Sequence, residues 1–480
     1  MKKIRNNISK YAVLLALTAT PLVITSCRQE LDINVDPNNP SQASLSGLLS
    51  ASQVGFAFAL GGEGTRMPAS IVQHYAGHRA QPLDYAQYRI TSSATDGTWT
   101  ALYNTLMDMK EMENKAAASG NQAYLGVSKI LQAHAFSVIT DLFGDIPFSQ
   151  ALQGRTNITP VYDKQEDIYP ALITMIDEGV AALTAATETI SGDIVYGGDV
   201  TKWKKYGNSL KLRLLNHLSS RQPNAAANFL ATNPSLIDTS VDDAKVLFGS
   251  VASNANPIYQ FDVLSGRKDQ AVASTIVDKM KALSDPRVSV YFEPVTRNAL
   301  GLKGQYLGNA PGNDTEDSQK NRYSRVGSAY ASIKAPVVLM SAAEVNFIKA
   351  EVYYRASNAA SAQAAYQAAI TQDFAALGLS SSAATTYLAN ANVAYNGTLQ
   401  RIMEQKWITM FQASYESWVD WRRTGFPVLT PAANNMTSNV IPRNLPYPEV
   451  EINSNRANLE AGPGIPIPYT GLSNRVWWDN

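Results

Sequence analysis

Residues 130–152 read ILQAHAFSVITDLFGDIPFSQAL, and this stretch decides how the chain folds. With the residues just before it, it places apolar side chains at steps of three and four, the period of one helix face. The stripe consists of Tyr124, Val127, Leu131, Val138 and Leu142. Gly144 follows the stripe and Pro147 cannot continue a helix, so we expect a helix over residues 121–143 that stops at the glycine.

Other helices of similar length flank this one in the sequence. Residues 97–117 precede it with an apolar side of their own, and three further helix pairs follow. These cover residues 166–186 with 201–219, 341–355 with 359–377, and a last pair from 398 through Trp418. A pair of this size buries its apolar stripe only against neighbouring pairs. The pattern predicts an all-α chain of tetratricopeptide-like helix pairs, in which Trp407, Trp418 and Trp421 pack between helices.

Long segments without helical periodicity separate the pairs. Residues 71–93 are rich in Tyr, Gln, His and Arg, and residues 233–268 and 291–333 are rich in Gly, Asn, Pro, Asp and Tyr. The tail, residues 427–480, has Pro, Asn and Gly throughout and no amphipathic helix. Long irregular segments in a compact protein are usually functional loops, so we expect loop decorations on a helical scaffold.

The first residues read as a targeting segment. Four basic residues precede the apolar run YAVLLALTA at residues 11–19, which is far too short to span a membrane. The small residues before Cys27 resemble a lipobox, and Cys27 is the only cysteine of the chain. We therefore expect a signal peptide over residues 1–26, lipidation (palmitate) at Cys27, a polar tether over 27–43 and one helical domain over 44–480. One or two acyl chains anchor a protein to a bilayer without spanning it.

The charge balance argues against a nucleic-acid partner. The whole chain has 40 Lys and Arg against 40 Asp and Glu, and removing residues 1–26 removes four of the basic residues. The remaining 36 basic and 40 acidic residues give a net charge of −4. Phosphate binding needs a basic surface, which this composition does not supply.

Residues 130–152 and three further stretches together resemble a known protein family. The three further stretches are SAAEVNFIKAEVYYR at residues 341–355, IMEQKWITMFQASYESWVDWRRTGFPVL at 402–429 and IPRNLPYPEVEINSNRANL at 441–459. Together with the lipobox, their order and spacing resemble the SusD/RagB family, most closely its SusD-like branch. The resemblance covers nearly the whole chain after Cys27.

The resemblance implies a fold and a function. The expected fold is a superhelix of four tetratricopeptide-like units with irregular segments in front. The expected function is capture of an oligosaccharide or other nutrient, without catalysis, for a SusC-like TonB-dependent transporter. The protein would sit on the outer membrane, anchored by its lipid and facing the cell exterior. A structural or adhesive surface lipoprotein is the alternative from another functional class.

Catalytic and metal sites have weaker support in the sequence. A glycosidase needs two carboxylates at one cleft. Asp141/Asp145 are instead expected at a helix-end turn, and Glu344/Glu351 as a pair that is either solvated or bridges helices. His74 and His78 lack the Glu that a zinc-protease motif places after the first His. We expect these two to be hydrogen-bonded loop residues and His134 and His217 to be satisfied core residues. The sequence assigns no metal-ligating residue and no cofactor, and it leaves open a calcium ion in the loops rich in Asp and Asn, none of which has dedicated spacing.

Sugar recognition needs aromatic faces for C–H groups and polar side chains for hydroxyls. Two irregular segments offer both. We expect the ligand to contact residues from them: Tyr75, Arg79, Asp84, Tyr85, Tyr88 and Arg89 from the first, and Tyr291, Arg297, Tyr306, Arg322 and Tyr323 from the second.

Overall fold

The computed structural model describes residues 43–296, 301–314 and 321–479. Residues 45–480 form one compact unit. Cys27, the signal peptide and nearly all of the tether lie outside the described residues, as does Arg297. The expectations for them therefore stay predictions.

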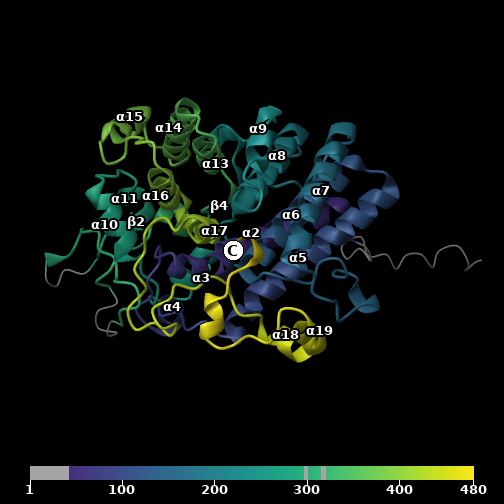
Figure 1. Cartoon of the computed structure of the whole chain (residues 1–480), viewed down its shortest axis with the longest axis horizontal. Coiled ribbons are helices and arrows are strands. Elements are labelled where there is room, and N and C mark those ends of the chain that lie inside the picture. Colours follow the sequence, from purple (N-terminus) through teal and green to yellow (C-terminus); the bar gives the residue numbers. More distant parts are fainter. Residues whose placement is uncertain (1–42, 297–300, 315–320, 480) are drawn as a thin grey trace, which may run out of the picture. The chain divides into compact units, whose positions relative to one another are not determined.

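The four predicted helix pairs are confirmed, with bounds that differ by a few residues. They are α5 (Ser92–Ser119) with α6 (Gln122–Phe143), α7 (Gln165–Ala185) with α8 (Val200–His217), α13 (Ala342–Arg355) with α14 (Ala359–Ala376), and α16 (Leu399–Thr409) with α17 (Ser414–Thr424). Each pair packs against the next: α6 contacts α7, and α8 contacts α13, which contacts α16. Figure 1 shows the two groups, α5–α8 in blue and α13–α17 in green.

Local sequence signals set the ends of these helices. Asn121, Ser341 and Thr398 each precede a helix and accept a hydrogen bond from the backbone N–H three residues on, which satisfies a donor that the first turn leaves free. Gly144 ends α6 at a φ of 91°, as predicted. An L-residue at such a φ is strained, so glycine suits the stop.

Small residues let the helices α6, α7 and α8 approach closely. A Cβ added to Gly126 of α6 would lie 2.6 Å from the carbonyl oxygen of Gly179 in α7. One added to Gly207 of α8 would lie 2.7 Å from the Val180 side chain of α7. These distances are below van der Waals contact, so the glycines are required for the observed packing.

The predicted Trp packing is also confirmed. Trp407 and Trp418 are buried, and Trp421 is partly buried against the core. Two helical segments, Leu45–Ile71 and Gln165–Ala185, reach the length and hydropathy of a membrane span. The first is interrupted between α2 (Leu45–Gly61) and α3 (Glu63–Ile71), and both pack against core helices. Their length and hydropathy are therefore only weak evidence that they cross a membrane.

The structure contains short elements that sequence periodicity missed, some inside the segments expected to be irregular and some beside them. They include α4 (Ala80–Ala86), α10 (Ser274–Ala282), α11 (Val288–Tyr291), α12 (Ser328–Ala331) and the π-helix Tyr259–Leu264. Two antiparallel ribbons pair β1 (Ala244–Val246) with β4 (Val337–Met340) and β2 (Phe292–Glu293) with β3 (Arg325–Val326). Such elements are too short to show a period, so tertiary contacts decide them.

The expectation of a tail without helix is wrong in part. α18 (Glu449–Ser454) and α19 (Arg456–Ala461) interrupt it and lie at the lower edge of Figure 1 in yellow. The tail then returns to the helices, where Trp478 is fully buried. Its indole N–H donates a hydrogen bond to Asp141 at 2.8 Å, so the end of the chain is fixed to α6.

Candidate functional site

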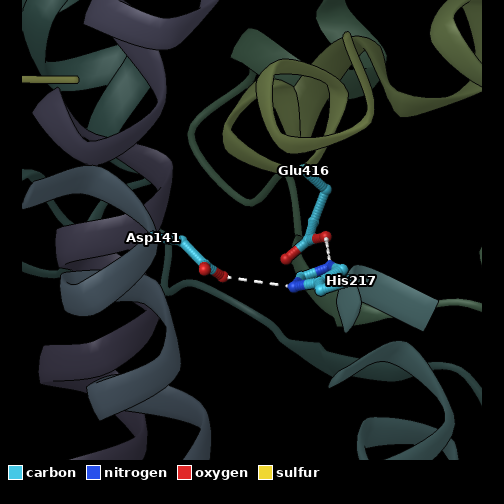
Figure 2. A group of neighbouring side chains, drawn as sticks. All are labelled: Asp141, His217 and Glu416. Atoms are coloured by element: carbon cyan, nitrogen blue, oxygen red, sulfur yellow. Dashed lines mark hydrogen bonds and ion pairs between the residues drawn. The ribbon is translucent and has the colours of Figure 1, made fainter. Parts of the chain in front are cut away.

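Three ionisable side chains from three helices meet inside the protein (Figure 2). Asp141 comes from α6, His217 from the end of α8 and Glu416 from α17, and all three are buried. The imidazole Nδ1 lies 3.3 Å from an Asp141 oxygen, and Nε2 lies 3.0 Å from a Glu416 oxygen. Tyr169 donates to the other oxygen of Asp141 at 2.5 Å.

The charge of His217 decides whether this cluster suits a metal. Burial alone would lower its pKa, but Glu416 and Asp141 together raise the pKa of His217 from 6.5 to about 9. His217 is therefore an imidazolium at neutral pH. Its Nε2 donates to Glu416, and its Nδ1 lies 3.0 Å from the Tyr169 hydroxyl and pairs with Asp141. A metal ligand needs a free lone pair on nitrogen. The arrangement fits a buried ion pair that joins α6, α8 and α17, which is a structural role.

The carboxylates considered for catalysis are held by cations in the same core. Glu344 receives two hydrogen bonds from Arg213, each 2.6 Å long. Glu351 is bound by Arg423 at 2.9 Å and by Arg355 at 2.8 Å. The expected helix-bridging role is confirmed for both, because Arg213 lies on α8 and Arg423 on α17.

The other histidines are also hydrogen-bonded, as predicted. His74 is fully buried between the Ser414 hydroxyl and the Trp407 carbonyl, and burial lowers its pKa to about 3. His78 bonds the Lys268 carbonyl through Nε2. His134 accepts from Arg213 at 2.8 Å and contacts the Tyr206 hydroxyl. Its pKa is held well below the usual range by burial and by Arg213, so it is neutral.

The two segments expected to bind the ligand lie against each other. The Asn309 amide donates to the Gly77 carbonyl at 3.3 Å, and the Gln87 amide donates to the Gly312 carbonyl at 2.9 Å. The ring of Tyr323 lies 6.4 Å from that of His78. The sequence predicted that both segments serve one function, and the fold brings them together.

Four of the proposed tyrosines are not on the surface of this face. Tyr75, Tyr85, Tyr88 and Tyr291 are all at most 2% exposed. Phe411 helps to bury two of these tyrosines. Its ring stacks on that of Tyr291, with the ring centres 5.3 Å apart, and packs edge-on to that of Tyr75 at 5.6 Å. Their rings are core contacts in this structure, so the expectation that they offer a platform to a ligand has to be corrected.

The remaining candidates reach solvent. Arg79 lies 2.5 Å from an oxygen of Asp269 and its side chain is 37% exposed. Asp84 and Arg89 lie 3.8 Å apart, each about half exposed. Tyr306, Arg322 and Tyr323 are half-buried along the second segment. These polar and aromatic groups are therefore at least partly exposed to solvent.

One part of this face was missed by the sequence analysis. The guanidinium of Arg66, on α3, lies 3.7 Å from the ring centre of Phe261, and that of Arg267 lies 4.8 Å from the same ring. The Arg66 side chain also pairs with Glu63 at 2.9 Å. No sequence signal links residues almost two hundred positions apart, so only the fold shows this cluster beside α4.

A family model described as "Starch-binding associating with outer membrane" matches residues 37–448. The chain belongs to the SusD-like family. The resemblance drawn from the sequence is thereby confirmed, and so is the all-α architecture of tetratricopeptide-like pairs. No curated protein matches this SusD-like chain significantly in sequence.

Solved structures agree with this assignment. A chitin-binding protein is 25% identical over 91% of this SusD-like chain and 100% of its own, with a TM-score of 0.80. A chitin-binding SusD homolog from Flavobacterium johnsoniae is 24% identical over 91% of this chain and 98% of its own, with a TM-score of 0.76. A SusD/RagB family protein from Bacteroides thetaiotaomicron is 22% identical over 92% and 99%, with a TM-score of 0.78. The last two show the fold alone.

Proposed function

We propose that this SusD-like protein is a surface lipoprotein that binds an oligosaccharide and delivers it to a SusC-like TonB-dependent transporter. The family model, described as starch-binding and outer-membrane-associated, supports glycan binding at that membrane. Cys27 would carry the lipid anchor and place the protein outside the cell. Binding would occur without catalysis.

The observation that carries the proposal is the meeting of the two irregular segments on one face. Arg79, Asp84 and Arg89 on the first segment offer charged groups to sugar hydroxyls, while Tyr306 and Tyr323 on the second offer ring surface. Arg322 adds a further cation there. A face with charged groups and aromatic rings suits the hydroxyls and C–H groups of a sugar better than a small apolar ligand.

The absence of catalysis is proposed from the state of the acids. Glu344 and Glu351 are ion-paired in the core, and Asp141 already binds Tyr169, Trp478 and His217. A glycosidase needs one protonated and one ionised carboxyl group that face the same bond. Carboxylates engaged in this way are not free to protonate a glycosidic oxygen.

Calorimetric titration with chito- and malto-oligosaccharides tests the binding claim. We expect saturable heat with one of the two series and at least a tenfold weaker Kd in Tyr323→Ala, which corresponds to the loss of about 1.4 kcal/mol. Tyr354→Ala is the matched control, because Tyr354 is a half-buried tyrosine on α13. Its affinity should equal that of the unchanged protein.

Three outcomes would count against the proposal. Equal weakening in both tyrosine variants would mean that the face is misplaced. Failure of both glycan series to bind the folded protein, together with failure to co-purify with a transporter, would favour the adhesive alternative. Turnover of any bound glycan by the pure protein would contradict the absence of catalysis.

The anchor is tested separately in cells. Cys27→Ala should leave the protein unacylated and absent from the outer-membrane fraction, because the only thiol that could take a lipid is gone. Labelling with a fatty-acid analogue and fractionation of the membranes measure this. Cys27→Ala protein that still incorporates the label would refute the assignment.

A further inference from the structure

A cavity of about 270 Å³ lies inside the helical array, apart from the proposed glycan face. It is bounded by β4, α12, the start of α13, the end of α14 and the segment that follows α16. Figure 1 shows β4 near the centre of the view, with α13 and α14 above it and α16 to its left. The walls of the cavity include Val338, Leu339, Leu377 and Met410, so most of the lining is apolar. The volume equals that of about nine waters, which is enough for a small organic molecule.

Asp243 lines this cavity without a counterion. The residue is 7% exposed, and one carboxylate oxygen accepts a hydrogen bond from the Ala342 N–H at 2.7 Å. The other oxygen has no hydrogen bond or ion pair to any residue that the structure describes. By contrast, the neighbouring Asp242 has two cationic partners, because Lys205 and Lys202 lie 2.6 and 3.4 Å from its carboxylate.

The pKa of Asp243 reflects the absence of an ion-pair partner. Burial raises the pKa of Asp243 to about 7, although Ala342 and Lys245 oppose the shift. Lys245 is exposed, and in the described part of the chain it makes no ion pair with Asp243. A buried carboxylate in this state is expected to bind a cation that reaches it, since pairing removes most of the desolvation penalty.

Two further polar groups face the same space. Asp373 is 7% exposed, and its one engaged oxygen accepts from Arg287 at 2.6 Å and from Thr409 at 3.1 Å. Arg287 is shared with Asp285, so one guanidinium serves two carboxylates in this cluster. The Nε2 of Gln412 is buried and has no partner within the described residues. Glu344 also lines the cavity, but Arg213 satisfies both its oxygens.

We propose that this cavity is a second binding site, which takes a small primary amine with its ammonium group on Asp243 and its carbon body against the apolar walls. Lys245 also lines the cavity but makes no ion pair with Asp243, so the unpaired Asp243 carboxylate can select a cation, and the walls select a ligand with apolar carbon. The ring of Tyr330, which also lines the cavity, adds a surface that attracts ammonium groups. A hard metal ion suits the cavity poorly, because Ca²⁺ requires six to eight oxygen ligands.

Matched ligands test the charge requirement on the full-length protein. Cyclohexylamine and cyclohexanol have the same carbon ring and differ in charge. Comparing glucosamine with glucose tests whether an amino sugar can be the amine ligand. We expect saturable calorimetric binding of cyclohexylamine at millimolar concentration and at least tenfold weaker binding of cyclohexanol. At pH 7 binding should release about half a proton, because the ammonium keeps Asp243 ionised.

Matched variants locate the site. Asp243→Asn keeps the acceptor for the Ala342 N–H and removes the charge, so it should weaken cyclohexylamine binding at least tenfold. Asp242→Asn is the control, since its lysine partners lie outside the cavity lining, and it should bind normally. Ala376 lines the cavity and is exposed, so Ala376→Leu should fill part of the cavity and weaken binding without unfolding the protein.

Several results would overturn the proposal. They are equal affinity for cyclohexylamine and cyclohexanol, full binding by Asp243→Asn, and the absence of saturable heat with every amine at millimolar concentration. Stronger binding of Ca²⁺ than of any amine would likewise refute the assigned ligand class. None of these results bears on the glycan face, which Tyr323→Ala tests by itself.

Discussion

Replacing His217 with Gln tests the charge that the structure places in the buried cluster of Asp141, His217 and Glu416. In the folded protein the two carboxylates raise the pKa of His217 from 6.5 to about 9. A raised pKa in the folded state stabilises the fold below the unfolded pKa, and this contribution is lost as the pH rises through the folded pKa. The contribution should therefore be complete below 6.5 and absent above 9.

The size of the effect follows from the shift. Each pKa unit corresponds to about 1.4 kcal/mol, so His217 should contribute about 3 kcal/mol of unfolding free energy that disappears between pH 6.5 and 9. The substitution also leaves Asp141 and Glu416 without their shared cation. Removing one partner of a buried ion pair typically costs about 3 to 5 kcal/mol, which is the loss we expect at low pH.

Denaturant unfolding followed by tryptophan fluorescence measures both effects, because Trp478 lies 6.2 Å from the His217 ring. The control is His78→Gln. Burial lowers the pKa of His78, so this group affects stability only below its ordinary pKa of 6.5. The control should keep the pH dependence between 6.5 and 9, whereas His217→Gln should lose it.

A clear result would refute this reasoning. If His217→Gln kept the full loss of stability between pH 6.5 and 9, another group would have to titrate there, and His217 would be neutral in the fold. A neutral His217 would also have a free nitrogen lone pair, which would reopen the question of a metal in the cluster.

Two further substitutions test the packing of the helices and of the tail. Gly126→Val places methyl groups against the carbonyl of Gly179 and should lower the free energy of unfolding, measured by calorimetry, by about 1 to 3 kcal/mol or more. The control Gly197→Ala, at a φ of 62° in open space, should lower it by only about 1 kcal/mol. Equal losses of stability would contradict the close approach of α6 and α7. Trp478→Phe removes the bond to Asp141 and should cost about 1.5 to 3 kcal/mol and speed proteolysis of the C-terminal tail; unchanged proteolysis would mean that this bond does not hold the tail.

The helix pairs could be predicted because their signals are local. The stripe over residues 121–143 repeats at the period of one helix, Asn121 caps its start and Gly144 ends it. All of these signals lie within one element, so no tertiary contact is needed to read them. The short helices α4, α18 and α19 lack such a period, and packing against distant segments decides them.

The candidate site shows where the sequence stops being sufficient. The segment around Tyr75, Tyr85 and Tyr88 has the aromatic and polar composition of a sugar-binding loop, and composition is the same whether a ring faces solvent or core. Phe411 and Gln412, more than three hundred residues away, contact Tyr75 and bury it. The exposure of each tyrosine is therefore set by the fold.

The sequence by itself determined the helical scaffold and the family resemblance, because periodicity, caps and motif order are properties of contiguous residues. Only the tertiary structure decided which groups carry charge in the interior. His217 is an imidazolium because α6 and α17 bring Asp141 and Glu416 to it, and burial raises the pKa of Asp243 to about 7 with no ion pair among the described residues to oppose it. Desolvation and Coulomb energies depend on distance in space, and the chain sets that distance only when it folds.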